Sequence, residues 1–431
     1  MSEWVESPLA ELANIVSGGT PSRDVPAYWG GDIPWVTPTD ITACRTNYLE
    51  QTEYTISKQG LLGSSAKLLP VGAILLTSRA SIGLSKIAKT PVTTNQGFKS
   101  LVPKQGVDGT FLFYQTQRLR GAFERFAAGS TFLEINRRDT ERILLPHPTD
   151  PVEQKKIATI LTGIDTAIEK TEALVAKYQQ IKAGLMHDLF TRGVLPNGQL
   201  RPSREQAPEL YQETAIGWIP KEWNPVSLRE LVGAGNIVNG PFGSDLLTSE
   251  LKTEGVPVLY VQDIKPGFFS RVSSAHVSEQ KANELAFCSV RKGDVLVAKV
   301  GTPPCDSCVY EYEQRAVVTQ DVIRIRTTLD VNSLFLASLL ISTYGRKAIK
   351  RISIEGTRER VSLTEFKSLV FPVAPPDEQL LISQKLGAAQ AVISAENCKL
   401  AKLTSQKRGL MHDLLTGKVP VKVEDPEVGY G

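Results

Sequence analysis

A stretch of 44 residues occurs twice in this chain, and this internal repeat restricts the possible folds more than any other feature. Residues 151–194 and 376–419 align without a gap and share 17 identities in 44 positions. The best-matched part, Gly184-Leu-Met-His-Asp-Leu-Phe-Thr191, returns as Gly409-Leu-Met-His-Asp-Leu-Leu-Thr416. A repeat of this length indicates a duplicated structural unit. We therefore expect a fold with an approximate internal twofold.

Both copies of the repeat carry the apolar pattern of a long helix. Steps of four and three residues from Ile157 to Leu189 meet eight apolar residues in ten positions, and the same steps from Ile382 to Leu414 do so too. This is the a/d spacing of a coiled coil. The polar exceptions fall at matching places, at Thr171 and Lys182 in the first copy and at Glu396 and Lys407 in the second. We expect the two helices to pair in antiparallel orientation. The alternative is that each helix packs only on its own domain.

The regions that precede the two helices match more loosely and are of mixed α/β type. Three short segments recur: Ile33–Ile41 as Val256–Ile264, Val71–Leu75 as Lys292–Leu296, and Val92–Gln96 as Val317–Asp321. Alternating or β-branched runs predict strands, among them Val317–Ile325. One late helix is expected in each half, at Gly109–Ala127 and at Val331–Ile352.

The fold class expected from these patterns is α+β (mixed α/β). Two similar globular domains would be separated by a pair of long antiparallel coiled-coil helices, with a pseudo-twofold internal repeat. The expected segments are 1–150, a first globular domain; 151–194, a central helix; 195–372, a second globular domain that includes a linker at 195–207; and 373–431, a distal helix and tail.

Composition is that of an ordinary globular protein, with 41% hydrophobic and 22% charged residues. The N-terminus lacks the basic and apolar regions of a signal peptide. Five cysteines, an odd number, do not suggest a disulfide framework, so we expect a cytoplasmic protein with no membrane partner. The net charge of +3 does not demand a polyanionic partner, so any nucleic-acid signal must come from local patches.

Motifs that would indicate catalysis are missing from the sequence. There is no Walker A motif and no Asn-Pro-Pro-Phe/Tyr motif of an amino-methyltransferase. Cys305-Asp-Ser-Cys308 stands alone, whereas zinc needs two more ligands at suitable spacing. His187 and His412 lie in the repeated Met-His-Asp without a nucleophile nearby, and we interpret them as helix-end residues. We expect no catalytic site, no cofactor and no metal in this chain.

Basic clusters and donor-rich loops recur at matching places in the two halves. Residues 345–361 hold six Lys or Arg and two Glu, and residues 117–138 form a similar cluster in the first half. The loops at 77–83 and 94–96 have counterparts at 298–301 and 319–321. Arg and Lys suit phosphate oxygens and guanine, and Asn and Gln suit adenine. A charge run is usually a solvated face, but recurrence in both halves favours DNA binding.

Taken together, these features resemble the DNA-specificity subunit of type I restriction-modification systems. The resemblance rests on Gly18-Gly-Thr-Pro-Ser22, Trp29-Gly-Gly-Asp-Ile-Pro-Trp35, Asp40-Ile41, Thr94-Asn-Gln-Gly-Phe98, the Pro-x-Glu-Gln segments ending at Gln154 and Gln379, and the Gly-Leu-Met-His-Asp-Leu repeats. It covers nearly the whole chain in the order variable region, helix, variable region, helix. The second half departs from the first, because Leu259-Tyr-Val replaces Pro34-Trp-Val and Gln320-Asp321 replaces Asn95-Gln96.

The resemblance implies a non-catalytic subunit in which each globular domain is a target recognition domain. Each would read one half of an asymmetric, bipartite site in double-stranded DNA, while the paired helices set the spacer and dock methyltransferase subunits. It also implies two methyltransferase (modification) subunits, which use S-adenosylmethionine, and restriction (motor and nuclease) subunits, which use ATP. These cofactors are therefore expected in the partners.

The candidate DNA-binding residues are drawn from the recurring loops and basic clusters. In the first half they are Thr20, Arg23, Thr39, Ser78, Arg79, Asn95, Gln96, Lys99, Arg118, Ser130, Thr131 and Arg137. In the second half they are Ser244, Gln262, Lys299, Gln320, Arg346, Lys350, Arg351, Thr357, Arg358 and Arg360.

Two other interpretations remain open from the sequence. One is a stand-alone DNA-modifying enzyme, a nuclease or methyltransferase, with an unrecognised site. The other is a pseudo-symmetric scaffold that binds no DNA. Turnover by the purified chain would favour the first, and failure to bind DNA even with methyltransferase partners would favour the second.

Overall fold

The computed structural model describes residues 3–79, 81–128, 133–243, 245–356 and 358–422. The chain forms two compact units: unit 1 comprises Met1–Leu174 and Glu396–Gly431, and unit 2 comprises Val175–Ala395. Two long helices, α7 (Pro151–Thr191) and α13 (Pro376–Leu414), each begin in one unit and end in the other. The division therefore runs across the helices rather than at their ends. The four segments expected from the sequence, each with its own role as a globular domain or a long helix, remain a prediction.

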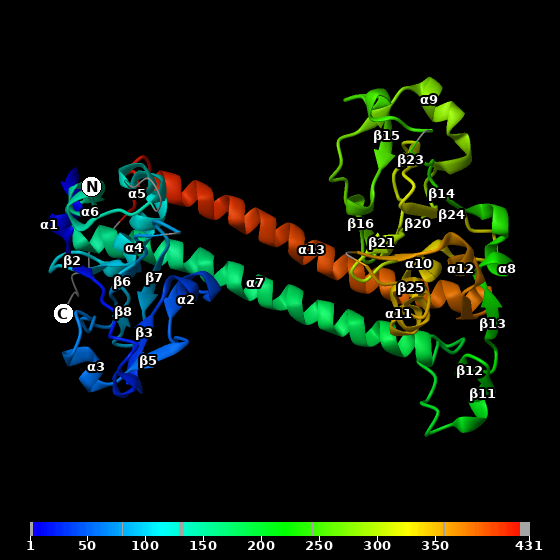
Figure 1. Cartoon of the computed structure of the whole chain (residues 1–431), viewed down its shortest axis with the longest axis horizontal. Coiled ribbons are helices and arrows are strands. Elements are labelled where there is room, and N and C mark those ends of the chain that lie inside the picture. The colour runs from blue at the N-terminus through cyan, green and yellow to red at the C-terminus, as the bar shows by residue number, and fades with distance from the viewer. Residues whose placement is uncertain (1–2, 80, 129–132, 244, 357, 423–431) are drawn as a thin grey trace, which may run out of the picture. The chain divides into compact units, whose positions relative to one another are not determined.

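Unit 1 is built around a five-stranded sheet with the order β2-β9-β6-β7-β4 (Figure 1). Its strands are β2 (Ala13–Ser17), β9 (Lys99–Pro103), β6 (Ile74–Leu76), β7 (Ser85–Ala88) and β4 (Tyr48–Leu49). A smaller sheet has the order β5-β3-β8, and a two-stranded ribbon joins β1 to β10. These strands are β5 (Tyr54–Ile56), β3 (Trp29–Val36), β8 (Thr93–Thr94), β1 (Trp4–Pro8) and β10 (Leu144–Pro148). The helices are α1 (Leu9–Leu12), η1 (Pro26–Tyr28), α2 (Pro38–Ala43), α3 (Lys58–Leu62), α4 (Gly109–Arg118), α5 (Arg120–Phe126) and α6 (Arg137–Arg142).

Unit 2 contains two four-stranded sheets, β14-β24-β20-β22 and β18-β15-β23-β19, and a three-stranded sheet, β21-β26-β25. Their strands are β14 (Ile237–Asn239), β24 (Val322–Ile325), β20 (Val295–Ala298), β22 (Ser307–Val309), β18 (His276–Val277), β15 (Val256–Leu259), β23 (Ala316–Val318), β19 (Ser289–Val290), β21 (Val300–Gly301), β26 (Glu359–Val361) and β25 (Ser353–Ile354). Three ribbons pair β11 (Tyr211–Thr214) with β12 (Gly217–Pro220), β13 (Asn224–Ser227) with β27 (Val370–Val373), and β16 (Ile264–Lys265) with β17 (Phe268–Phe269). The α-helices are α8 (Leu228–Val232), α9 (Glu279–Glu284), α10 (Ser333–Ile341), α11 (Thr343–Lys350) and α12 (Leu363–Ser368). The 3₁₀ turns are η2 (Pro208–Leu210), η3 (Ala234–Asn236), η4 (Thr248–Glu250), η5 (Val261–Asp263) and η6 (Ala286–Cys288).

The two units repeat one arrangement of strands. In unit 1, β2 pairs with β9, which pairs with β6, which pairs with β7; in unit 2, β14, β24, β20 and β22 follow the same order. In both units a strand also runs parallel to a later one, β3 beside β8 and β15 beside β23. The mixed α/β class and the internal repeat expected from the sequence are thus confirmed.

The ends of the long helices are built into the cores of the units. In unit 1 the apolar core includes Ile157 and Leu161 of α7 together with Leu414 and Leu415 at the end of α13. In unit 2 it includes Leu189 and Phe190 of α7 together with Ile382 and Leu386 of α13. The start of one helix therefore lies beside the end of the other in each unit, which is the antiparallel pairing expected from the heptads (Figure 1).

The repeated Glu-Gln pair at the start of each long helix fastens that helix to its unit. The Gln154 Oε1 accepts from the backbone N–H of Asp108, the N-cap of α4, at 2.9 Å, and Gln379 Oε1 does the same for Asn332, the N-cap of α10, at 3.0 Å. The carboxylates of Glu153 and Glu378 accept from the indole N–H groups of Trp4 and Trp223 at 3.3 and 3.0 Å. This motif is therefore structural in both halves.

Three elements are shorter than the sequence predicts. The expected strand Val317–Ile325 is divided into β23 and β24 by a turn at Thr319, whose carbonyl accepts from Val322 N–H. The expected helix Gly109–Ala127 is divided into α4 and α5 at Leu119. The expected helix Val331–Ile352 is divided at Ser342, which is extended and whose side chain accepts from Gly345 N–H to start α11. At Ser342, local capping thus outweighs the helical pattern. Among the described residues, no helix is both long and apolar enough to cross a bilayer.

Candidate nucleic-acid interface

Three loops of unit 1 that are far apart in the sequence are joined at one edge. The Gly19 N–H donates to the Thr94 carbonyl at 2.9 Å, which joins the loop after β2 to the segment after β8. The Ser78 N–H donates to the Gly97 carbonyl at 2.7 Å, and the Ile135 N–H donates to the Ser78 carbonyl at 3.1 Å. The β6–β7 loop therefore lies between the β8–β9 loop and the segment before α6.

Unit 2 joins the same three loops, with two equivalent backbone bonds and a third, from Gly240, that is shifted by one residue. The Gly240 N–H donates to the Thr319 carbonyl at 3.1 Å, and the Lys299 N–H donates to the Asp321 carbonyl at 2.8 Å. The Val361 N–H donates to the Lys299 carbonyl at 3.3 Å. Loops that the sequence indicated as separate donor-rich and basic segments are thus brought together in each unit.

A glycine is required where the first of these loops turns. A Cβ atom at Gly18 would lie 1.9 Å from the Asn95 carbonyl oxygen, and one at Gly240 would lie 2.0 Å from the Val318 carbonyl oxygen. Real Cβ atoms cannot approach so closely, so any side chain would separate the loops. The Gly-rich turns are therefore needed for assembly of the edge.

The backbone bonds align the two edges differently from the sequence comparison. Ser78 corresponds to Lys299, because each donates to the loop after the parallel strand, and their acceptors Gly97 and Asp321 then correspond. Gln96 thus corresponds to Gln320, not to Asp321. The sequence pairing was one residue out, and both units carry a glutamine at this position, exposed in each case.

In unit 1 the edge is crossed by an ion cluster centred on Glu134. Arg79 lies 2.8 Å from one Glu134 oxygen, and Lys99 Nζ lies 3.3 Å from the other. Burial would raise the pKa of the Glu134 carboxyl, but the hydrogen bonds from Arg79 and Lys99 outweigh it and hold the pKa below its usual value. Ser78 and Lys99 are buried, and Lys99 Nζ lies 3.4 Å from Ser78 Oγ. These two side chains support the loops from within.

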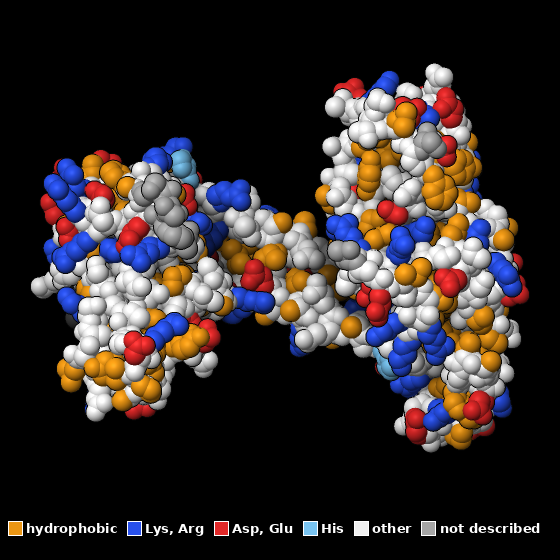
Figure 2. All heavy atoms as spheres, in the orientation of Figure 1, with side chains coloured by type: hydrophobic (Ala, Val, Ile, Leu, Met, Phe, Trp, Pro, Cys, Tyr) orange, Lys and Arg blue, Asp and Glu red, His pale blue; other side chains and the backbone are white. Residues whose placement is uncertain are grey.

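In unit 2 the corresponding place is occupied by a basic residue. In unit 1, Glu134 forms a backbone β-bridge with Arg79, and in unit 2, Arg360 forms the equivalent pair with Val300. Arg360 therefore corresponds to Glu134. Lys350, Arg351, Arg358 and Arg360 are all exposed. Figure 2 shows Lys and Arg side chains on this face of unit 2, over the region of β21 and α11. The second edge is therefore an open basic surface.

Two predicted basic residues hold parts of the fold together. The Arg346 Nη1 donates to the Pro304 carbonyl at 2.8 Å, and the guanidinium also forms an ion pair with Asp306, which fastens α11 to the β20–β22 loop. The Arg118 Nε donates to Gln115 at 2.9 Å, and burial lowers the pKa of the Arg118 guanidinium. The Gln115 amide itself donates to the Leu415 carbonyl at 2.7 Å, so Arg118 lies on the side of the long helices.

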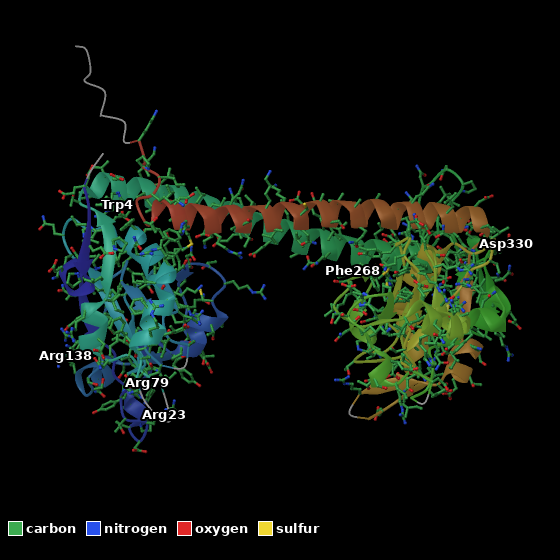
Figure 3. The ribbon with its side chains drawn as sticks, turned by 90° about the horizontal axis from the view of Figure 1, so that it is seen from above. Trp4, Arg23, Arg79, Arg138, Phe268 and Asp330 are labelled. Atoms are coloured by element: carbon green, nitrogen blue, oxygen red, sulfur yellow. The ribbon has the colours of Figure 1, made fainter. Side chains whose placement is uncertain are left out.

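The remaining predicted residues are mostly exposed near the edges. In unit 1, Thr20 donates to Gln96, Asn95 Oδ1 accepts from Gly97 N–H at 2.9 Å, and Arg137 pairs with Glu141 at 2.7 Å. Arg23, Thr39, Gln262 and Gln320 are exposed, and Lys299 is half-buried. Arg23, Arg79 and Arg138 lie at the end of unit 1 away from α7 and α13, whereas Trp4 lies beside the helices (Figure 3). Ser130, Thr131, Ser244 and Thr357 lie outside the described residues.

The Asp-Ile pairs of the recurring motif have a structural role in both units. Asp40 accepts from the backbone N–H and hydroxyl of Thr37, both at 2.7 Å, and so caps α2. Asp263 accepts from Tyr260 N–H at 2.8 Å and from the Ser273 hydroxyl at 2.5 Å. Burial alone would raise the pKa of the Asp263 carboxyl, but these hydrogen bonds lower it.

Three residues at the edge of unit 1 were not predicted as site residues. No sequence pattern indicated Glu134, because its partners Arg79 and Lys99 are distant in the sequence and meet it only in the folded chain. Trp29 and Tyr54 line a surface pocket with Arg23. Aromatic residues in or beside a β-strand pattern usually belong to the core, so no sequence pattern indicated that these two would line a surface site.

The motifs examined for metal or acid–base chemistry are dispersed. His187 and His412 are exposed near the ends of α7 and α13, and their carbonyls accept from Thr191 and Thr416. Cys305 and Cys308 are buried, and burial raises the pKa of both thiols to about 12. Within the described ranges, no cluster of three or more His, Cys, Asp or Glu is arranged to hold a metal ion.

Comparison with known proteins gives one consistent group. The family model for the type I restriction modification DNA specificity domain matches residues 1–178. The MjaIX specificity subunit of a type I restriction enzyme from Methanocaldococcus jannaschii is 32% identical over 262 residues, which cover 60% of this chain and 57% of that protein. The MjaVIII specificity subunit of the same organism is 23% identical over 355 residues, covering 81% and 79%. The first of these alignments thus spans little more than half of the relative.

Solved structures share the fold over nearly the full length. The S subunit of a type I restriction-modification system from M. genitalium has a TM-score of 0.58 at 15% identity, with 96% of each chain covered. A chain from a structure of the assembly and conformational transition of a type I system has a TM-score of 0.57 at 16% identity, covering 96% of this chain and 98% of that one. The match of residues 1–178 to the specificity-domain model, the curated relatives and the shared fold agree: this chain is similar to the specificity subunits of type I restriction-modification systems.

Proposed function

We propose that this chain is the non-catalytic subunit that recognises DNA in a type I restriction-modification complex. Each unit would read one half of an asymmetric, bipartite site in double-stranded DNA. The observation that carries this proposal is the same assembly of loops at one edge of both units, joined by matching backbone bonds but lined by different side chains. One scaffold with two different surfaces is suited to reading two different sequences.

The side chains offered by the two edges fit the chemistry of DNA. Gln96 and Gln320 are exposed at corresponding positions, and a glutamine amide can pair with adenine N6 and N7. Arg23, Arg358 and Arg360 are exposed guanidinium groups, which suit phosphate oxygens or guanine. Of the predicted residues, we propose these five as the first to contact DNA.

We propose that the paired helices set the distance between the half-sites and dock two methyltransferase subunits. The methyltransferase subunits would bring S-adenosylmethionine, and restriction subunits would bring ATP. Because the proposed partner is double-stranded DNA, we place the complex in the cytoplasm. The similar chain from a structure of type I complex assembly supports a multi-subunit context for this fold.

The proposed reading function is tested by mapping DNA methylation in a host that carries the intact system. The expected result is methylated adenine in one bipartite asymmetric motif that disappears when this chain is deleted. A methylation pattern that does not depend on the chain would contradict the proposal. The purified chain alone is expected to show no turnover of DNA or S-adenosylmethionine.

The spacer role is tested by shortening both helices. Asp165 pairs with Lys407 in unit 1, so residues 168–174 lie opposite residues 398–404. Deleting both segments removes one heptad from each helix, about 10 Å of rise or roughly three base pairs of B-DNA. We expect both half-sites to be retained with a shorter spacer or, if that spacing cannot be bound, methylation to be lost. An unchanged spacer would contradict the proposal.

A further inference from the structure

A shallow pocket of about 300 Å³ opens on the surface of unit 1, and Arg23, Trp29 and Tyr54 line it. This volume is at the small end of the range for small-molecule sites, about 300–1,000 Å³. Two of its three walls are aromatic rings. Tyr54 is 44% exposed, so part of its ring is open to a ligand.

The rings of the pocket are held in place before any ligand binds. Trp35 is buried behind them, with its ring centroid 4.9 Å from that of Trp29 and 6.4 Å from that of Tyr54, both edge to face. The Trp29 indole N–H donates to the Ser22 carbonyl at 3.0 Å, and the Trp35 indole N–H donates to the Gly19 carbonyl at 2.9 Å. A rigid aromatic wall loses little entropy when it binds a planar ligand.

The polar groups at the rim suit a nucleotide. Arg23 is exposed there and supplies a cation for a phosphate, and it lies at the same end of unit 1 as Arg79 (Figure 3). A hydrogen bond to the neighbouring Glu53 carboxylate raises the pKa of the Tyr54 phenol, so the phenol already has a partner within the protein. The pocket thus offers two aromatic rings and a cation.

The strand of unit 2 that corresponds to β3 lacks the aromatic side chains that line this pocket. β15, the counterpart of β3, begins at Val256, and its four side chains are all buried. The position of unit 2 that corresponds to Trp29 lies before this strand and is occupied by Lys252. The aromatic lining at this strand is therefore specific to unit 1.

We propose that Arg23, Trp29 and Tyr54 form a site for a single nucleobase that has left its stack, with the ring of the base on the aromatic wall and its phosphate on Arg23. This inference rests on the proposed function and adds a mode of contact to it. In a regular duplex the faces of each base are covered by its neighbours, so an aromatic wall can stack only on an unstacked base. The site would therefore take a base displaced when unit 1 binds its half of the DNA.

The test uses the full chain and a short oligothymidylate as the probe, with affinity measured by fluorescence anisotropy. Trp29→Ala and Tyr54→Leu are each expected to weaken binding about 5- to 100-fold, the usual range for loss of one base–aromatic stack. Tyr54→Leu keeps apolar bulk next to Trp35, so it reports the ring face even where Trp29→Ala disturbs the loop. Near-ultraviolet circular dichroism checks that the remaining rings keep their arrangement.

Trp218→Ala in unit 2 is the matched control. Trp218 is 46% exposed, but Arg204 already lies 5.0 Å from its ring centroid. We expect this variant to bind the probe as the unchanged chain does. An abasic oligonucleotide of the same length should bind more weakly than oligothymidylate, and its binding should not respond to Tyr54→Leu.

The proposal is overturned if the unchanged chain does not bind oligothymidylate at low salt, or if Tyr54→Leu binds it with unchanged affinity. Either result leaves the proposed reading function intact, because that function is measured separately by the methylated motif in the host. A methylated motif that persists after deletion of the chain, with oligothymidylate binding retained by the purified chain, would instead contradict the reading function alone.

Discussion

The edge of unit 1 and the edge of unit 2 share their backbone connections but differ in charge. In unit 1 the Glu134 carboxylate occupies Arg79 and Lys99, and in unit 2 the corresponding residue is Arg360, which faces Val300. Backbone bonds hold the loops in both units, so side chains at the edge are free to differ without loss of the fold. This is what a protein needs if each half reads a different sequence.

The helix contacts differ between the units in the same way. Lys407 forms an ion pair with Asp165 at 2.7 Å in unit 1, and in unit 2 Lys182 donates to the Gln390 amide oxygen at 2.7 Å. These lysines are the polar exceptions at matching heptad positions, and Asp165 and Gln390 also correspond. The geometry of the crossing is therefore kept while its charge changes.

The largest expected effect concerns the start of α13 in unit 2. Glu378 accepts from both terminal nitrogens of the buried Arg201, at 2.5 and 3.0 Å, and from the Trp223 indole. Glu378→Gln leaves this guanidinium without its buried partner, so we expect unfolding free energy to fall by about 3–5 kcal/mol. Chemical denaturation measures it.

The matched control uses the same arginine. Glu222 lies 3.1 Å from Arg201 but is 51% exposed, so Glu222→Gln should cost at most about 1 kcal/mol. Equal losses in the two variants would show that burial does not distinguish these contacts.

The next effect compares the two helix crossings. Asp165 accepts from Lys407, from Asn47 at 2.6 Å and from the Tyr114 hydroxyl at 2.7 Å. Asp165→Asn removes the charge and leaves at least one buried donor poorly satisfied, with an expected cost of about 1–3 kcal/mol. Gln390→Glu, the reverse change in unit 2, should be neutral or stabilising by under about 1 kcal/mol. Thermal unfolding of both variants measures the difference between the two effects. A loss of stability in Gln390→Glu would contradict this prediction.

Burial lowers the pKa of Lys182, so the stability of the protein should depend on pH through the contact of Lys182 with Gln390. Between the lowered pKa and the ordinary lysine pKa the unfolded chain binds more protons, so stability rises with pH there. A carboxylate at position 390 favours the charged lysine and should flatten this alkaline rise. The slope of unfolding free energy against pH measures it, and an unaltered slope would contradict the assignment to Lys182.

A smaller effect is expected for the open basic edge. The joint change Arg358→Ala and Arg360→Ala removes two exposed cations from unit 2. We expect DNA affinity to fall about tenfold and the slope of log affinity against log salt to become shallower by up to about 2, if both contact phosphate. The joint change Lys418→Ala and Lys422→Ala, at two exposed lysines after α13, serves as the control and should leave the slope unchanged.

The smallest effect concerns the edge of unit 1, where Glu134 pairs with Arg79 and Lys99. Glu134→Gln frees Arg79 and Lys99 from their shared carboxylate, so non-specific DNA affinity should rise a few-fold and its salt slope should steepen by about 1. The lowered pKa of Glu134 means that its stabilising pairs are complete above the ordinary glutamate pKa and are lost as pH falls through the lowered value. The variant should lose that acid-dependent part of its stability. Weaker DNA binding by Glu134→Gln would indicate that the cluster itself contacts DNA.

The repeat made much of this fold predictable. The a/d pattern located both long helices to within a few residues, and its polar exceptions at Lys182 and Lys407 are the residues that cross-link them. Burial was less predictable. Ser78, Lys99 and Arg346 belong to donor-rich segments, but their side chains support the loops, because a sequence pattern does not show which way a loop residue faces.

Contacts between residues that are far apart in the chain could not be predicted from the sequence patterns. The one-residue error between Asn95-Gln96 and Gln320-Asp321 arose because the two copies differ in loop length before this point, and only the backbone bonds fix the register. The pocket of Trp29 and Tyr54 needs Trp35 behind it, and this arrangement depends on pairing of β3 with β5.

The central claim is that the two units read their half-sites independently. The most direct measurement is a methylation map of a host in which residues 1–150 are replaced by those of a family member that recognises a different sequence. The account predicts a motif in which one half changes while the other half and the spacer are retained. A motif in which both halves change, or neither does, would contradict it.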